Sequence, residues 1–295
     1  MADDLAARRG YLVEAFRVFR LRDSALAPIP PHYHDFHKII LFLSGEAGYV
    51  IEGREWRLAP RDIILVRAGD IHRPLPAPGV PYERLVIYVS PAFLDGCRRG
   101  GDDLARCFTL AAGDRGVQHL APGSAHDLLY HMEKLERTAR DGGFAHDLYT
   151  EMMFIEFMIL LNRALLGHEL DPLPPRVRSE KIQRLLTYIN DHLADDLSVD
   201  HLAASLYVSR FHLMRQFKAA TGYSLHQYIL SKRLLRARRL LLDQPGTTAE
   251  EVAAAAGFAD VSGFFRAFRR QFHTTPGALR AAAAPGTGAG EKTPH

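Results

Sequence analysis

The chain has very little cysteine. Of its 295 residues only Cys97 and Cys107 are cysteines, and they match neither a zinc-ligand spacing nor a disulfide framework. This predicts a reducing compartment. The charged Met1–Gly10 segment is not followed by the apolar core of a signal peptide, and no run approaches the roughly 20 apolar residues of a membrane span. The composition therefore predicts a cytoplasmic protein without a membrane partner.

Recognisable catalytic motifs are also missing from the sequence. It contains no P-loop and no dinucleotide fingerprint, and no paired carboxylates or nucleophile–base arrangement can be placed in it. We therefore expect no enzyme activity and no cofactor.

The small net charge of +3 conceals an asymmetry between the two halves. Between Arg176 and Arg280 there are 16 Lys and Arg against 9 Asp and Glu, whereas the remainder holds 21 basic and 25 acidic residues. The positive charge that could meet a polyanion is therefore concentrated in the C-terminal part. The chain is long enough for two domains, each with its own core.

One C-terminal stretch, Ser198–Lys218, has the pattern of a helix, a tight turn and a second helix. Ser198 and Ser209 can cap the two helix starts. The outer face of the second helix carries donors and no acidic residue: Arg210, His212, Arg215 and Lys218. A helix-turn-helix that enters the major groove needs this pattern, but an ordinary helical hairpin with a solvated basic face has it too.

An imperfect second copy that begins at Thr248 favours DNA binding. Thr248 and Glu251 have capping-box spacing, and Gly257 stands where the turn needs a glycine. The copies align Leu202 with Val252 and Ala203 with Ala253. After one inserted residue in the turn, they align Leu213 with Phe264, Arg215 with Arg266, and Phe217 with Phe268. Between the copies, Ser224–Gln244 predicts one helix of about 30 Å, close to one turn of B-DNA.

The stretch from Ile182 to Arg280 resembles the AraC/XylS family of bacterial transcription regulators. The resemblance covers about 100 residues and rests on the alanine-containing first helices, the Gly257-Phe258 pair, the run from Phe264 to Arg269, and Thr275-Pro276. Two positions depart from the family pattern: His273 replaces a usual glycine, and Leu225 a frequent proline. Both lie outside the recognition helices, so they put only local loop geometry in doubt.

This resemblance implies which side chains contact DNA. The implied DNA-binding positions are Arg210, Phe211, His212, Met214, Arg215, Val261, Ser262, Phe265 and Arg266. Arg commonly reads guanine, and Phe, Met and Val suit a thymine methyl group. A core position remains the alternative for Phe211 and Phe265. The implied partners are double-stranded promoter DNA, a small-molecule effector, a second copy in a homodimer, and RNA polymerase as a further candidate.

The N-terminal part, Tyr11–Val89, reads as a series of short strands separated by turns. The expected strands are 38–43, 48–51, 55–58, 62–66 and 84–89. Strands at such short intervals predict an antiparallel barrel or sandwich. Within it, the His32-Tyr33-His34 pattern, Gly45 and the Gly69–His72 run resemble the cupin barrel, which commonly forms the sensor of AraC-type regulators.

Four histidines of this region are candidate effector-binding residues: His32, His34, His37 and His72. We expect the effector to be a small polar molecule, with a sugar as one candidate. A metal site at His32, His34 and His72 is an alternative, opposed by Lys38, where metal-binding cupins have Glu. It would make the protein a metal-dependent cupin enzyme fused to a DNA-binding domain. Histidines that merely complete the barrel mouth are the third interpretation.

The remaining segments connect these parts. No element is predicted for 91–123, and apolar spacing predicts helices over 125–140 and 144–167, the second a candidate dimerisation helix. The predicted fold is therefore multidomain: a cupin-like effector-sensing β-barrel (1–123), a helical connector (124–170), a proline-rich linker (171–177), an all-α double helix-turn-helix (178–281) and a disordered tail (282–295).

Overall fold

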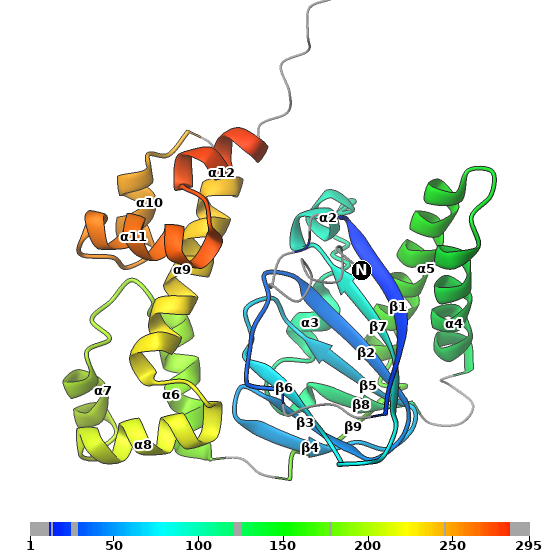
Figure 1. The fold of residues 1–295 in the computed structure, drawn as a ribbon, viewed down its shortest axis with the longest axis horizontal. Coiled ribbons are helices and arrows are strands. Elements are labelled where there is room, and N and C mark those ends of the chain that lie inside the picture. The colour runs from blue at the N-terminus through cyan, green and yellow to red at the C-terminus, as the bar shows by residue number, and fades with distance from the viewer. Residues whose placement is uncertain are drawn as a thin grey trace, which may run out of the picture. The chain divides into compact units, whose positions relative to one another are not determined.

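A computed structural model describes residues 12, 14–24, 29–120, 126–176, 179–244 and 246–283 (Figure 1). The Met1–Gly10 segment, position 177 of the predicted linker and nearly all of the predicted disordered tail lie outside the described residues. The chain forms two compact units, one built by the chain up to Gln183 and the other mainly by the chain from Arg184 onward. Each unit is described by itself.

The first unit is built on two antiparallel sheets. The six-stranded sheet has the order β1 (Phe16–Asp23), β7 (Tyr82–Val89), β2 (His37–Ser44), β5 (Asp62–Val66), β8 (Val117–His119) and β9 (Asp171–Pro172). The three-stranded sheet has the order β4 (Arg54–Arg57), β3 (Ala47–Ile51) and β6 (His72–Pro76). The cupin-like barrel is confirmed, and its sheets include four strands that our strand list lacked: β1, β6, β8 and β9.

The residues of β2 alternate between two cores, one on each side of the six-stranded sheet. Ile39 and Leu41 belong to an outer core, and Ile40 and Phe42 belong to an inner core that also contains Trp56. Because neighbouring side chains of a strand point to opposite faces, and both faces are covered, the strand is continuously apolar from Ile39 to Leu43. A fully buried side chain of this size contributes roughly 1.5–3 kcal/mol.

Helices cover the outer core (Figure 1). They are α2 (Pro91–Gly96), α3 (Arg106–Leu110), α4 (His126–Asp141) and α5 (His146–Leu166). Phe154, Phe157 and Leu161 of α5 are completely buried in this core. The short α3 lies where no element was predicted. A five-residue helix has little stability of its own, and it is held here because Cys107 and Phe108 are buried.

Residues of the proline-rich stretch after α5 hydrogen-bond to the barrel. Asp171–Pro172 forms β9 against β8, and the Leu173 amide donates to the Val117 carbonyl at 3.0 Å. The Trp56 indole donates to the Leu173 carbonyl at 2.9 Å, and the Arg176 amide to the Glu55 carbonyl at 2.7 Å. Residues 171–176 therefore follow the surface of the first unit in an extended conformation.

The described part of the second unit is entirely helical. Its helices are α6 (Glu180–Asp191), α7 (Val199–Ser205), α8 (Arg210–Thr221), α9 (Leu225–Asp243), α10 (Ala249–Ala255), α11 (Val261–Phe272) and α12 (Pro276–Ala283). The central α9 begins with the predicted capping box of Ser224 and Gln227. His273, which replaces a family glycine, ends α11 with a φ of 55°, the left-handed conformation that glycine adopts most readily. The predicted all-α double helix-turn-helix is confirmed.

Candidate functional site

The first helix-turn-helix consists of α7 and α8. The hydroxyl of Ser198 accepts a hydrogen bond from the His201 amide at 3.3 Å, and that of Ser209 accepts one from the His212 amide at 3.3 Å. Both predicted caps are therefore confirmed. Four inward-facing side chains are buried: Leu202, Ala203, Leu213 and Phe217. They leave the opposite face of α8 free for a partner.

The second helix-turn-helix, α10 and α11, repeats this construction. Thr248 and Glu251 form the predicted capping box, in which the Glu251 carboxylate accepts from the Thr248 amide at 2.8 Å. The buried positions are those aligned with the first copy: Val252, Ala253, Phe264 and Phe268. Two helix pairs with the same buried pattern therefore present α8 and α11 in the same way.

The two turns share a left-handed backbone at one position. Tyr207 in the first turn has a φ of 54°, and Gly257 in the second has a φ of 93°. A Cβ atom at Gly257 would lie 2.1 Å from the Leu193 carbonyl oxygen, so only glycine fits there. Tyr207 has no such restriction, and its side chain is 96% exposed.

The structure leaves most of the nine predicted DNA-binding side chains exposed. Phe211 is 70% exposed, which excludes the core interpretation for this residue. His212 and Phe265 are half-buried, and the Phe265 ring packs edge-on against Phe264 with centroids 5.4 Å apart. The exposed members are Arg210, Phe211, Met214, Arg215, Val261, Ser262 and Arg266.

Aspartates accompany an arginine on each recognition surface. Asp260 caps α11 by accepting from the amides of Ser262 and Gly263 at 3.0 and 2.8 Å, and its Oδ2 also lies 3.5 Å from the Arg266 guanidinium. In the first copy, Asp200 Oδ1 lies 3.7 Å from Arg210 Nη1. Exposed ion pairs of this kind contribute at most about 1 kcal/mol, so their main consequence is the orientation of the arginine.

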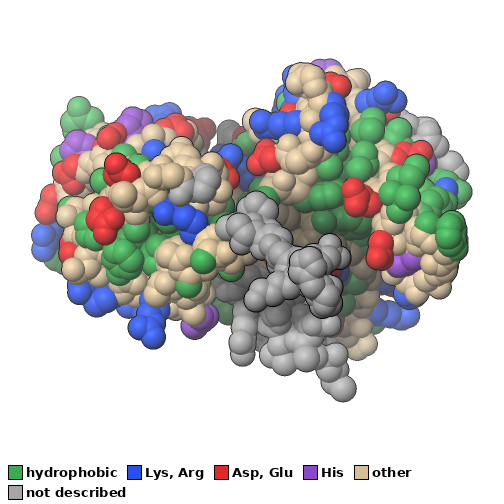
Figure 2. Space-filling view, turned by 90° about the horizontal axis from the view of Figure 1, so that it is seen from above, with side chains coloured by type: hydrophobic (Ala, Val, Ile, Leu, Met, Phe, Trp, Pro, Cys, Tyr) green, Lys and Arg blue, Asp and Glu red, His purple; other side chains and the backbone are tan. Residues whose placement is uncertain are grey.

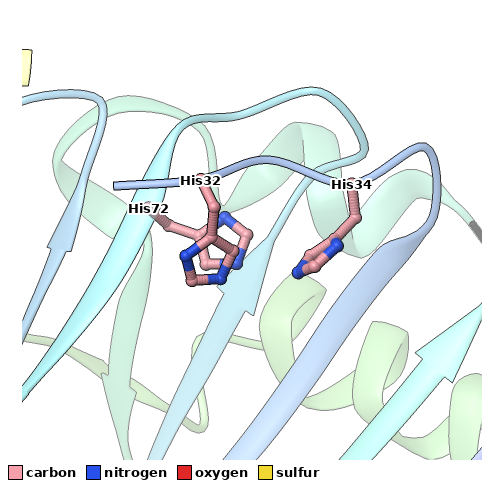
Figure 3. A group of neighbouring side chains, drawn as sticks. All are labelled: His32, His34 and His72. Carbon is pink, nitrogen blue, oxygen red and sulfur yellow. The ribbon is translucent and has the colours of Figure 1, made fainter. Parts of the chain in front are cut away.

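Three of the four predicted effector-binding histidines meet in the barrel (Figure 3). His32, His34 and His72 each offer one ring nitrogen, and these atoms lie within 4.8 Å of one another. His32 comes before β2 but is fixed to β6, because its amide and the His72 amide donate to each other's carbonyl oxygens at 3.0 and 2.8 Å. The fourth, His37, belongs to β2 and stacks on Phe108 at 4.0 Å in the outer core.

Hydrogen bonds define the tautomers of two of these rings. Nδ1 of His32 lies 2.9 Å from the Pro30 carbonyl oxygen, and Nδ1 of His72 lies 2.8 Å from that of Asp70. A carbonyl oxygen only accepts, so each Nδ1 carries the proton and each Nε2 presents a lone pair. The Lys38 ammonium nitrogen lies 3.2 Å from Nε2 of His72 and 3.3 Å from Nε2 of His34.

Burial keeps these imidazoles neutral. Desolvation, and after it the charge of Lys38, lowers the pKa of His32 to about 4 and holds the pKa values of His34 and His72 well below the usual range. Desolvation, followed by the charge of Arg84, lowers the pKa of Lys38 to about 7. The cluster is therefore a set of neutral acceptors around one buried amine.

The same three imidazoles are the candidate metal ligands. Two of them donate Nδ1–H to a backbone carbonyl, as metal-bound histidines commonly do. The amine of Lys38 lies against two of the three Nε2 atoms, however, and would have to move or lose its proton before these atoms could hold a cation. The three imidazole nitrogens are therefore suitable metal ligands, but the position of Lys38 disfavours the binding of a metal cation.

Two family models match this chain. One, described as an AraC-like ligand binding domain, matches residues 20–142, and the other, a helix-turn-helix domain, matches residues 202–282. The chain is also 27% identical over 268 residues to the HTH-type transcriptional activator RhaS of Shigella sonnei, covering 86% of this chain and 88% of that protein. RhaS of Escherichia coli O1:K1 is 26% identical over 271 residues, with the same coverage.

The chain belongs to the AraC family of DNA-binding transcription regulators.

Two solved structures of regulators are also similar. The DNA-binding domain of AdpA, in complex with a target DNA, is 34% identical over 34% of this chain and 89% of that chain, with a TM-score of 0.33. ToxT from Vibrio cholerae is 13% identical over 92% of this chain and all of that chain, with a TM-score of 0.38. No described helix of this AraC-family protein has the length and apolar character to cross a membrane.

Three residues of this AraC-family protein were missed as candidate site residues. Asp260 could have been found because it precedes α11 and can cap its first turn. Tyr207 could have been found because the alignment of the two copies places it opposite Gly257. Lys38 was considered only as an obstacle to metal, since its contact with His72 depends on how β2 and β6 approach each other, which no local sequence pattern reports.

Proposed function

We propose that this AraC-family regulator recognises promoter DNA through α8 and α11, and that a small polar molecule in the barrel modulates this binding. One observation carries the proposal: α8 and α11 have the same buried pattern, and three of their four aligned base-facing positions are exposed in both helices. The 19 residues of α9 between the two pairs span about 28 Å. That length suits two recognition helices in successive major grooves, where each Arg can read a guanine.

Selection from a random duplex library tests sequence recognition. The purified protein is expected to enrich a motif with two parts about one helical turn apart, and its affinity should fall steeply as salt rises. A variant with Arg215→Ala and Arg266→Ala serves as the matched control and should lose the motif. Equal recovery of all sequences at low salt, or no DNA binding at all, would contradict the proposal.

The effector part rests on the polar groups in the barrel: His32, His34, His72 and Lys38. A sugar is one candidate effector, since imidazoles and an amine can hydrogen-bond to hydroxyl groups. The measurement is the affinity for the selected operator with and without each candidate compound. Identical affinities and identical footprints for every compound that binds the barrel would remove the proposed coupling.

We also propose that two copies associate through α5. Leu148, Met152, Ile159 and Leu166 are between 37% and 63% exposed and recur at helical spacing on one side of the helix. Figure 2 shows hydrophobic side chains gathered on the side of the first unit where α4 and α5 lie. Sedimentation should give a dimer for the protein and a monomer for Met152→Glu. Asp147→Lys, which lies off this stripe, should stay dimeric.

The relatives suggest the direction of regulation. RhaS is named a transcriptional activator, and we propose that this chain likewise activates transcription in the cytoplasm, with RNA polymerase as a further partner. A reporter behind the selected operator should gain expression when the protein is present. Lower expression would identify a repressor instead.

A metal-dependent cupin enzyme is the second candidate function, because three imidazoles converge in the barrel. It predicts stoichiometric metal in the purified protein and loss of that metal in His34→Ala. If the protein purifies without metal and chelators do not change its DNA binding, the enzyme function is excluded and only the regulator function remains.

A further inference from the structure

The described interior of the barrel contains a buried amine, that of Lys38, which has no acidic partner among the described residues. Lys38 is 7% exposed. Its contacts are the Nε2 atoms of His34 and His72 and the face of the Tyr88 ring, whose centroid lies 5.1 Å from Nζ. Within the described ranges, no carboxylate forms an ion pair with Lys38. A buried ammonium whose direct contacts are all neutral is costly, and an anion beside it would offset much of that cost.

The second cation of the interior already has its partner. Arg84, 9% exposed, forms an ion pair with Asp23 at 2.7 Å and donates to the Tyr82 carbonyl at 3.1 Å. The charge of Arg84 is therefore compensated by Asp23, whereas that of Lys38 is not compensated by an ion pair with any described carboxylate. A single negative group beside Lys38 would supply the missing partner.

Two buried tyrosine hydroxyls of the barrel also lack partners among the described residues. Within the part of the chain that the structure describes, the hydroxyl oxygens of Tyr49 and Tyr82 have no hydrogen-bond partner, although each residue is only 1% exposed. The Tyr49 ring lies parallel to the ring of His72, with centroids 6.1 Å apart, and the Arg84 guanidinium lies 4.1 Å from the Tyr82 ring centroid. Buried donors are rarely left unpaired, and burial raises the pKa of both phenols, so each keeps a proton to donate.

We propose that the effector of this barrel is a small organic anion, whose acidic group pairs with Lys38 and whose remaining polar atoms accept hydrogen bonds from the unpartnered tyrosine hydroxyls. This inference rests on the proposed sensor function. A neutral polyol would satisfy the hydroxyls but leave the ammonium unpaired. A metal cation would add to the positive charge. Carboxylates and phosphate esters share the required chemistry.

Binding of simple anions to the full-length protein tests the inference. The probes are acetate, galacturonate and inorganic phosphate, matched by acetamide and galactose at constant ionic strength. The nitrogen resonances of the histidine rings report binding directly, because His34 and His72 contact Lys38. Acetate or phosphate should shift these resonances in a saturable way, whereas acetamide should not. Galacturonate should bind at least about tenfold more tightly than galactose.

Two variants test the contributions of the amine and of one hydroxyl to anion binding in a folded protein. Lys38→Met removes the buried charge while keeping a side chain of similar length, so it should stay folded and lose the anion response. Tyr49→Phe removes one unpartnered hydroxyl and should weaken galacturonate binding several-fold without abolishing the acetate response. Lys38→Arg keeps the cation, and it tests the inference through the same resonances should Lys38→Met not fold.

Several outcomes would overturn the inference: no saturable change with any anion, equal responses to acetate and acetamide, or an undiminished response in Lys38→Met. Acetate against phosphate distinguishes the two sources of the anion. Operator binding by the same samples is measured separately. Specific DNA binding without an anion response removes this inference alone, and an anion response without specific DNA binding removes the proposed function instead.

Discussion

Arg233 of α9 donates two hydrogen bonds to the loop that leads into the first helix-turn-helix. Its Nε donates to the Leu193 carbonyl at 2.8 Å, and its Nη2 donates to the Asp195 carbonyl at 2.9 Å. The same Leu193 carbonyl lies against Gly257, in the turn of the second helix-turn-helix. One arginine and one carbonyl therefore join the central helix to both DNA-binding pairs.

Replacement of Arg233 should uncouple the two pairs. Arg233→Met removes the donor of the part-buried Leu193 carbonyl and that of the exposed Asp195 carbonyl. Because the first is shielded from water, we expect a loss of about 1–3 kcal/mol in the free energy of unfolding. Affinity for a two-part operator should fall more than affinity for either half alone. Chemical denaturation and fluorescence anisotropy measure the two effects. Arg236→Met, on the same helix, is the control; equal losses in both variants would mean that Arg233 contributes only charge.

The two turns should respond oppositely to substitution. Gly257→Ala introduces a Cβ that would collide with the Leu193 carbonyl, and we expect it to destabilise the second unit by roughly 2 kcal/mol or more. Tyr207→Gly relieves a left-handed tyrosine and should stabilise the unit by up to about 1 kcal/mol. Thermal denaturation measures both. If Tyr207→Gly lost DNA affinity while gaining stability, the exposed ring would be a DNA contact.

The helix-turn-helix pairs also show which features could be predicted from the sequence. The caps at Ser198 and Thr248 and the aligned buried positions were predictable, because they depend on local spacing. The environments of the barrel histidines could not be predicted from the sequence. His37 precedes Lys38 on β2, so strand alternation places them on opposite faces, but the face that holds the other histidines is known only once β6 is in place. The short α3 depends on tertiary burial in the same way.

Asp260 should contribute to base preference as well as to the helix cap. Asp260→Asn keeps a good capping residue, so the free energy of unfolding should stay within about 0.5 kcal/mol of that of the parent protein. Loss of the carboxylate frees Arg266, and preference should relax at the operator positions read by α11. Library selection with this variant measures the effect, and Asp200→Asn is the matched control in the first copy. If the base preference at these operator positions is unchanged, Asp260 acts only as the N-terminal cap of α11.

The stability of the barrel should decrease in acid. Burial and Lys38 lower the pKa of His32 to about 4 in the folded state, and the pKa values of His34 and His72 are also lowered. Between pH 6.5 and 4 these histidines therefore bind protons in the unfolded chain but stay neutral in the folded barrel. The free energy of unfolding should decrease as the pH falls through this window, by on the order of 1 kcal/mol per pH unit for each histidine.

The single tryptophan makes this pH effect measurable. Trp56 is the only tryptophan of the chain and is buried in the inner core, so its fluorescence reports the first unit. His32→Gln should flatten the decline between pH 6.5 and 4. His226→Gln changes an exposed histidine of the second unit and should leave the decline unchanged. A parent protein equally stable at pH 6.5 and 4.5 would contradict the neutral-histidine cluster.

The two aligned arginines provide the most direct distinction between base reading and phosphate binding. Arg215 and Arg266 occupy equivalent exposed positions on α8 and α11. If each reads a guanine, Arg215→Ala and Arg266→Ala should each cost about 1–3 kcal/mol of binding energy and relax preference in a different half of the operator. Quantitative binding to operators mutated one base pair at a time would show two separate losses. An arginine that binds phosphate would instead weaken every sequence alike and reduce the salt dependence by about one charge, because each neutralised phosphate releases counterions.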